Sequence, residues 1–369
     1  MCKFGVFFKK TLTVFLCIFL LSFVCYATPS VSASSAILIN AGNGEVIFEK
    51  QADERRAMAS TTKIMTAIVA IENGDLDAEI TIPAAAVGVE GSSLYLKKGE
   101  KMTLYELLQG LMLRSANDAA ETIAISLCGS VEAFANLMNK KANELGLEHT
   151  HFTNPHGLHD DGHYTTAREL GIIASYAMKN VTFKEICSSK KANLPGNRIV
   201  VNHNKLLFSF EGACGVKTGF TKSSGRCLVS AAKRDGILLV AVTLSAPDDW
   251  NDHKEMLEYG FIEFESVTLA KQGDVFYSLP LIGGDKDSVT VTAQNDVTVC
   301  LRKNRASIVE KIELQKTRFA PVYKGETVGR VIYMLDGKEI ASANLVANEY
   351  VGERQNTTSL LDKIKNFFG

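Results

Sequence analysis

The chain lacks the charge and the cysteine spacing on which several classes of protein depend. Its 369 residues carry a formal net charge of −1, which gives nucleic-acid binding no electrostatic support. The eight cysteines include no Cys-x-x-Cys pair, and this excludes a zinc ribbon and a thiol-redox motif. What remains is ordinary globular composition, 46% hydrophobic and 22% charged, in a chain long enough for two domains.

The chain also lacks an apolar run long enough to span a membrane comfortably. Lysines near the N-terminus precede an apolar segment at residues 11–26, which at about 16 residues is short of the roughly 20 that a transmembrane helix needs. Residues 31–33, Val-Ser-Ala, offer a small-residue cleavage site, and Ala27 offers a second one. We therefore predict that residues 1–33 form a cleaved export signal, with an uncleaved anchor as the alternative.

Cysteine usage gives no disulfide framework. Such a framework needs an even, closely spaced set of cysteines, whereas the number left after the predicted signal is odd. We expect these residues to be buried free thiols; they are Cys128, Cys187, Cys214, Cys227 and Cys300.

Apolar periodicity predicts a mixed α/β domain followed by a β-rich one. Two apolar runs joined by Asn-Gly predict a hairpin at residues 36–49. Periodic stretches predict helices at residues 57–71, 103–115, 119–127, 131–145, 166–179 and 250–259, the last ending at Gly260. Apolar runs predict strands at residues 198–201, 215–220, 227–232 and 236–244.

The C-terminal third of the chain has a different hydrophobic pattern. Short alternating strands, broken by turn residues, indicate a separate small all-β domain from residue 266 to about residue 351. At residues 359–368 the apolar side chains fall on one helical face. We favour a helix lying on a membrane surface, and a helix docked on the β domain is the alternative.

Ser60 and Lys63 stand at the head of the predicted helix at residues 57–71. Serine is a good N-cap, so we expect the helix to begin at Ser60, with Lys63 on the same side of its first turn. A lysine desolvated by an apolar helix can take the proton of a neighbouring serine and make it a nucleophile. The pattern alone is weak, because Ser-x-x-Lys is expected about twice by chance in such a chain, and it recurs at residues 188–191.

Two further short motifs follow. Ser115-Ala116-Asn117 lies on a predicted loop between helices of an all-helical subdomain, where plain helix capping would explain it. Lys217-Thr218-Gly219 lies on or at the end of a predicted strand, where a glycine bulge would explain it. Lys-Thr-Gly is expected by chance in roughly one such chain in ten, so it is the most specific of the three signals.

A histidine-rich segment at residues 149–163 admits a metal site. His156, His159 and His163, with Asp160 or Asp161, could ligate zinc. The same segment carries Asn-Pro, His-Gly and Asp-Gly turn signals and no His-Glu-x-x-His helix to hold ligands. We therefore favour a surface loop without metal.

Taken together, the three motifs are those of penicillin-binding proteins and serine β-lactamases, in the same order. The sequence around these motifs resembles that of the low-molecular-mass penicillin-binding proteins, which are serine-type D-Ala-D-Ala carboxypeptidases of peptidase family S11. The stretches that carry this resemblance are A-S-T-T-K-I-M-T-A, R-S-A-N-D-A-A, T-N-P-H-G-L and G-V-K-T-G-F-T. The resemblance covers about residues 35–265. Over the β domain and the terminal helix, only the order of these parts along the chain is similar.

The resemblance implies a fold and a domain order. It implies the mixed α/β fold of penicillin-binding proteins and serine β-lactamases, with an antiparallel sheet flanked by helices and an all-helical subdomain, at residues 34–265. A small β-rich domain at 266–352 and an amphipathic helix at 353–369 would follow. The protein would be exported and held at the outer face of the cytoplasmic membrane.

The resemblance also implies a role for each motif residue. Ser60 would attack the carbonyl between the two terminal D-alanines, Lys63 would take its proton as a neutral amine, and Ser115 would pass that proton to the leaving amine. Asn117 would hold Lys63 and the amide of the substrate. The partners would be peptidoglycan stems ending in D-Ala-D-Ala and, as covalent inhibitors, β-lactams, with no cofactor and no metal.

The strand motif would bind the substrate. Backbone N–H groups of Ser60 and Phe220 would form the oxyanion hole, while Lys217, Thr218 and Gly219 would line the site and receive the terminal carboxylate. We expect the pKa of Lys63 to be lowered by burial and by the charge of Lys217, with Lys217 as the more exposed, cationic lysine.

Two features separate this hypothesis from its rivals. A class A β-lactamase would carry a Glu-x-x-Leu-Asn between the second and third motifs, and none is present. A scaffold protein with a degenerate site would lack some of the polar motif residues, and all are present.

One feature departs from the family pattern. In some relatives arginines help to bind the substrate carboxylate, but here the last core strand ends V-T-L-S-A-P-D-D without an arginine. The resemblance therefore leaves the carboxylate affinity and the peptide preference open.

Overall fold

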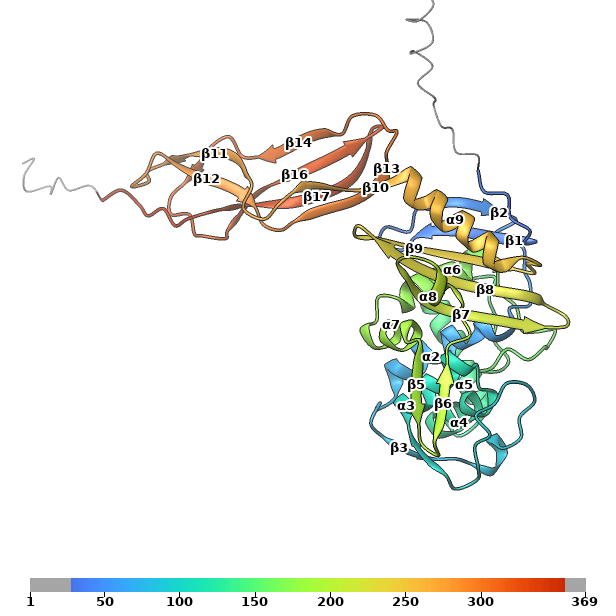
Figure 1. Cartoon of the computed structure of the whole chain (residues 1–369). Coiled ribbons are helices and arrows are strands. Elements are labelled where there is room, and N and C mark those ends of the chain that lie inside the picture. The colour runs from blue at the N-terminus through green and yellow to red at the C-terminus, as the bar shows by residue number, and fades with distance from the viewer. Residues whose placement is uncertain (1–27, 356–369) are drawn as a thin grey trace, which may run out of the picture.

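A computed structural model describes residues 28–355 and shows two parts that follow one another along the chain (Figure 1). The predicted terminal helix at residues 359–368 and most of the predicted export signal lie outside the described residues. None of the helices within residues 28–355 is long and apolar enough to cross a lipid bilayer.

The first part is built around a five-stranded antiparallel sheet of order β2-β1-β9-β8-β7. Its strands are β1 (Ser35–Asn40), β2 (Val46–Lys50), β7 (Ala213–Thr221), β8 (Gly225–Arg234) and β9 (Ile237–Leu244). The predicted hairpin and the three later strands are therefore confirmed, and the structure places them in one sheet.

Both faces of this sheet are covered, which explains why its central strands read as continuous apolar runs. In β1, Ile37 and Ile39 pack into a core shared with α6 (Ala167–Ala177), while Ala36 and Leu38 pack into a second core with α9 (Asp249–Glu263). Figure 1 shows α9 crossing the sheet.

Helix α9 does not end at Gly260 as predicted, because it continues to Glu263. A Cβ at Gly260 would lie 2.5 Å from Leu239 Cδ1 and 3.0 Å from Leu38 Cδ2. The glycine therefore allows the helix to approach the sheet closely and is not a C-cap.

The predicted all-helical subdomain is confirmed. From residue 104 to residue 144 the chain forms α3 (Leu104–Gln109), a π-helical turn η3 at Gly110–Arg114, α4 (Asn117–Cys128) and α5 (Val131–Glu144). Helix α2 (Lys63–Asn73) precedes it in the chain. The predicted capping box is present at Thr103 and Glu106. Two small hairpins lie against these helices, formed by β3 (Glu79–Thr81) with β4 (Lys101–Thr103) and by β5 (Lys191–Leu194) with β6 (Arg198–Val201).

The predicted strand at residues 198–201 therefore does not join the main sheet. It pairs with β5, which the sequence did not indicate. Short elements complete this part: η1 (Ala59–Thr62), η2 (Ala84–Ala86), α7 (Val181–Ser188) and α8 (Leu206–Ser209).

The second part is all β, as predicted. A six-stranded sheet of order β14-β16-β17-β12-β11-β15 accompanies the pair β10-β13. Its strands are β10 (Phe264–Ala270), β11 (Val275–Ile282), β12 (Ser288–Ala293), β13 (Val297–Arg302), β14 (Val309–Leu314), β15 (Arg318–Phe319), β16 (Thr327–Leu335) and β17 (Lys338–Ala347). It has a core of its own, separate from those of the first part.

Candidate active site

Ser60 lies in a tight turn that leads into a helix, and it is not a helix cap. The turn η1 spans Ala59–Thr62 in 3-10 geometry, α2 continues from Lys63, and no side chain caps either start. The hydroxyls of Thr61 and Thr62 bond back to the carbonyls of Met58 and Ala59, at 2.6 and 2.8 Å. These bonds fix the turn from within and leave the Ser60 hydroxyl free for other contacts.

Lys63 meets Ser60 as the spacing predicted. Its Nζ atom lies 3.1 Å from Ser60 Oγ, 2.6 Å from Asn117 Oδ1 and 2.6 Å from the carbonyl oxygen of His156. The lysine side chain is completely buried. It thus joins the first two motifs to the histidine-rich segment in one cluster.

The Ser115-Ala116-Asn117 motif connects two helical segments. Ser115 is buried with a left-handed backbone (φ 64°), and Asn117 is the first residue of α4, so only the first part of the motif lies between helices. Asn117 Nδ2 donates to the carbonyl of Glu90 at 2.5 Å, and the backbone N–H of Asn117 donates to the carbonyl of Ser92. These bonds orient the amide so that its oxygen faces Lys63.

The Lys-Thr-Gly motif lies in the edge strand β7, and this strand packs against the Ser60 turn. A Cβ at Gly219 would lie 3.1 Å from the backbone nitrogen of Ser60 and 3.2 Å from the carbonyl of Met58. Glycine here allows the strand to approach the Ser60 turn closely, and the register with β8 shows no bulge at this residue. Phe220, next in the strand, is 65% exposed.

The histidine-rich segment is not the surface loop that we expected. The Asn154 side chain accepts from the backbone N–H of His156 and Gly157 and folds the segment into a turn. Gly157 has a φ of +84°, and a Cβ there would lie 1.9 Å from the carbonyl of Ala59. The turn at residues 154–157 therefore packs directly against the Ser60 turn.

The two buried histidines of this segment are held as neutral rings. His163 Nδ1 accepts from the Thr153 N–H at 3.1 Å, so Nε2 carries the proton and donates to Thr62 Oγ1 at 2.7 Å. Burial lowers the pKa of His163 to about 3. His156 is also buried, with Nε2 3.4 Å from Glu121, whereas His159 points into solvent. Within residues 28–355 no group of three or more potential ligands is placed to hold a metal ion.

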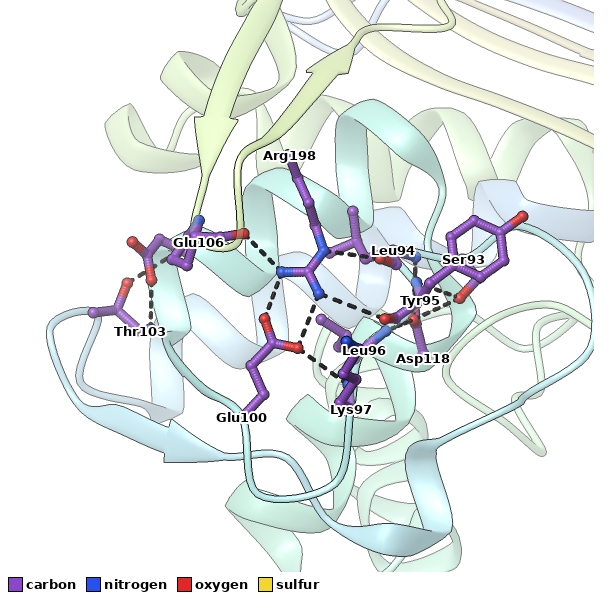
Figure 2. Close-up of polar contacts among 11 residues, drawn as sticks. Ser93, Leu94, Tyr95, Leu96, Lys97, Glu100, Thr103, Glu106, Asp118 and Arg198 are labelled. Carbon is purple, nitrogen blue, oxygen red and sulfur yellow. Dashed lines mark hydrogen bonds and ion pairs between the residues drawn. The ribbon is translucent and has the colours of Figure 1, made fainter.

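A loop at residues 90–96 forms one wall of the site, and two charged side chains fix it (Figure 2). The Asp118 carboxylate accepts from Ser93 Oγ at 2.6 Å and from the backbone N–H groups of Leu94 and Leu96 at 3.1 Å. From the other side, Arg198 donates to the Leu94 carbonyl at 3.0 Å and pairs with Glu100 through two nitrogens. Asp118 thus ties this wall to α4, the helix that Asn117 begins.

Comparison with known proteins identifies the family. A family model for peptidase S11, described as D-alanyl-D-alanine carboxypeptidase, matches residues 24–248, and one for the C-terminal domain of penicillin-binding protein 5 matches residues 264–353. The chain belongs to the peptidase S11 family. It is a serine-type D-alanyl-D-alanine carboxypeptidase of the penicillin-binding group.

Individual relatives match over nearly the whole chain. The D-alanyl-D-alanine carboxypeptidase DacF of Bacillus subtilis is 31% identical over 331 residues, which cover 86% of this chain and 85% of DacF. DacA of Escherichia coli K12 is 33% identical over 362 residues, or 92% and 89% of the two chains. Crystal structures of penicillin-binding protein 5 from Haemophilus influenzae superimpose with a TM-score of 0.70 at 31% identity, covering 89% of this chain and 99% of that one.

The two lysines of this S11 carboxypeptidase site are both buried. Burial, and then the charge of Lys217, lower the pKa of Lys63 well below its ordinary value, while Asp118 opposes them. The direction and its causes agree with our prediction. Our expectation that Lys217 is the more exposed lysine is wrong, because it is 1% exposed and burial lowers its pKa to about 7.

The structure brings residues of all three motifs together and adds others, whereas His159 lies in solvent. Ser60, Lys63, Asn117 and Gly219 are linked by the contacts above, Lys217 lies close enough to act on Lys63, and Ser115 precedes Asn117. Sequence reasoning missed the His156 carbonyl and Asp118. The turn signal Asn-Pro-His-Gly at residues 154–157 could have pointed to the His156 carbonyl. Asp118 directly follows the second motif, but no role in the site was predicted for it from the sequence. The second Ser-x-x-Lys is a coincidence, since Ser188 ends α7 and Lys191 begins β5.

Proposed function

We propose that this protein removes the terminal D-alanine from peptidoglycan stems through an acyl-enzyme on Ser60. The observation that carries the proposal is the set of contacts around Lys63 Nζ. Two of its three neighbours, the Asn117 amide oxygen and the His156 carbonyl, can only accept hydrogen bonds. A neutral amine has two N–H groups for these acceptors, and its lone pair then faces the Ser60 hydroxyl at 3.1 Å.

Lys63 thus acts as the general base. Burial, and then the charge of Lys217, lower the pKa of Lys63 well below its ordinary value. Both favour the neutral amine, which can accept the Ser60 proton as Oγ attacks the carbonyl between the two D-alanines. Ser115 then hands a proton to the leaving amine, and water hydrolyses the acyl-enzyme. Asn117 holds Lys63 and the substrate amide.

The strand β7 positions the substrate. The backbone N–H groups of Ser60 and Phe220 form the oxyanion hole, and Lys217 and Thr218 receive the terminal carboxylate beside Gly219. A substrate carboxylate arriving beside Lys217 favours the protonated form of this lysine, because an opposite charge raises the pKa of an amine. Lys217 is therefore expected to gain its proton as substrate binds.

Mass spectrometry after treatment with penicillin tests the nucleophile and its base. We expect a slowly hydrolysed penicilloyl adduct on Ser60, absent in Ser60→Ala. Lys63→Arg keeps the positive charge but cannot lose its proton at neutral pH, so it should fold and fail to be labelled. Ser188→Ala and Lys191→Arg, in the coincidental motif, are the matched controls and should label normally. Rapid labelling of Lys63→Arg, or penicillin turnover at β-lactamase rates, contradicts these roles.

We also propose that the protein is exported and that residues 356–369 bind the outer surface of the cytoplasmic membrane. The apolar face of Leu360, Leu361, Ile364, Phe367 and Phe368 supports this. Deletion of residues 356–369 should release active protein from washed membranes, as measured by penicillin labelling of the soluble fraction. Retention of the truncated, signal-processed protein on the membrane refutes the anchor.

A further inference from the structure

The carboxylate site proposed above is short of positive charge. Lys217 has a pKa of about 7 without substrate, so at neutral pH it carries only part of a charge. The segment after β9 contains no arginine. Arg226, opposite Phe220 in the sheet, is already bound to Asp249 at 2.8 Å. A second cation for the substrate must therefore come from outside this part of the sheet.

Arg114 is placed to supply it. It ends the π-helical turn η3 and directly precedes Ser115. Its Nη1 atom lies 3.1 Å from Nε2 of His203, whose own backbone N–H donates to the Leu113 carbonyl. Guanidinium groups only donate, so His203 accepts through a neutral ring and Arg114 keeps its charge. Within the described part of the chain, Arg114 forms no ion pair with a carboxylate.

The Arg114–His203 pair borders a cavity. The cavity measures about 430 Å³ and is lined by the 93–95 segment, Arg114, β6 and residues 202–203. The 90–96 loop that forms one side is the same wall that accepts the Asn117 N–H. Burial lowers the pKa of His203, and the positive charges of Lys217 and Arg114 lower it further, so Lys217 is near this histidine. Arg114 lines the cavity and directly precedes Ser115, the residue assigned to the leaving amine.

We propose that Arg114 is a specificity-determining residue that binds the carboxylate of the leaving D-amino acid, and that His203 positions it. The inference rests on the proposed function, since that function places the leaving group at Ser115. One N–H of the guanidinium is used by His203, which leaves a pair of parallel N–H groups for a two-point contact with a carboxylate. Tyr95 and Ile199, 77% and 72% exposed, form an apolar rim beside this charge.

Two peptides test the contact: an acyl-D-Ala-D-Ala with a free carboxylate, and the same peptide ending in a carboxamide. In Arg114→Gln, kcat/KM for the acid should fall about ten- to a hundred-fold, as for loss of a charged hydrogen-bonded contact, while kcat/KM for the amide stays unchanged. Arg55→Gln is the matched control, because Arg55 is also an exposed arginine bonded to a histidine ring, at 2.9 Å from His149. It should leave both peptides unaffected.

His203 is tested through KM. His203→Ala should raise KM for the acid and leave that for the amide unchanged, and His203→Gln, which restores an acceptor for Arg114, should recover most of the affinity. Equal losses for acid and amide in Arg114→Gln, or no loss for either, overturn the inference.

Binding without turnover separates this inference from the proposed function. Calorimetry with Ser60→Ala should show that the acid binds more tightly than the amide, and that Arg114→Gln removes the preference. If Ser60→Ala shows no such preference, the inference fails. If wild-type protein releases no D-alanine although the preference is present, the proposed function fails and the carboxylate site stands.

Discussion

Replacing Lys217 with methionine is expected to stabilise the protein while impairing its activity. The lysine is 1% exposed, its Nζ donates to the Thr218 carbonyl at 2.9 Å, and no carboxylate of residues 28–355 pairs with it. Burial alone lowers its pKa from 10.5 to about 7. Methionine fills similar space without a group that must lose its proton or remain charged in an apolar site.

The sign and size follow from proton binding. An unfolded chain holds the lysine proton up to about pH 10.5, whereas the folded protein releases it near pH 7. The unfolded state therefore binds more protons in this window, and wild-type stability rises with pH across it. At about 1.4 kcal/mol for each pKa unit, burying Lys217 costs about 4 kcal/mol at pH 7. Lys217→Met should recover up to that amount near and below pH 7 and almost none near pH 10.

Urea unfolding over this pH range measures the effect. The single tryptophan, Trp250 at the start of α9, reports the unfolding of the first part of the chain. Lys222→Met, at an exposed lysine just beyond β7, is the matched control and should change stability little at any pH. A wild-type stability that does not increase between about pH 7 and pH 10, or a Lys217→Met protein less stable than wild type at neutral pH, refutes the reasoning.

Two further substitutions probe the walls of the site. Asp118→Asn removes a carboxylate that accepts from three groups of the 90–96 loop and should cost about 3 kcal/mol of unfolding free energy. It also removes a charge that raises the pKa of Lys63, so the pH at which penicillin acylation is half-maximal should move down. The control Asp161→Asn, at an exposed carboxylate, should change neither the unfolding free energy nor this pH midpoint. Gly157→Ala places a Cβ 1.9 Å from a backbone oxygen of η1 and should abolish labelling and lower the urea midpoint. The control Gly146→Ala has a similar φ of +72° but open space around the new Cβ, so it should cost only about 1 kcal/mol of unfolding free energy. Equal losses of stability in the two variants would show that the clash at Gly157 is unimportant.

Local patterns predicted the elements whose stability is local. The capping box at Thr103 forms because its two hydrogen bonds lie within one helical turn. The hairpin of β1 and β2 and the neighbouring strands β8 and β9 follow from short turns between apolar runs. Where long-range packing decides, the local pattern was a poor guide. Gly260 was predicted to end the helix, but α9 continues to Glu263, and the glycine is explained by its close approach to Leu239 and Leu38 of the sheet.

The sequence by itself also predicted which residues would carry the chemistry. The first motif places Lys63 near Ser60 because residues three apart share a helical face, and the order of the three motifs predicted the family. Tertiary structure alone decided the ionisation of the site. The pKa of a lysine depends on what surrounds it, and burial is the largest cause of the shift at Lys63. One of the groups that enclose this lysine, the His156 carbonyl, comes from 93 residues further along the chain. The burial of Lys217 likewise depends on packing around β7, which no local pattern encodes.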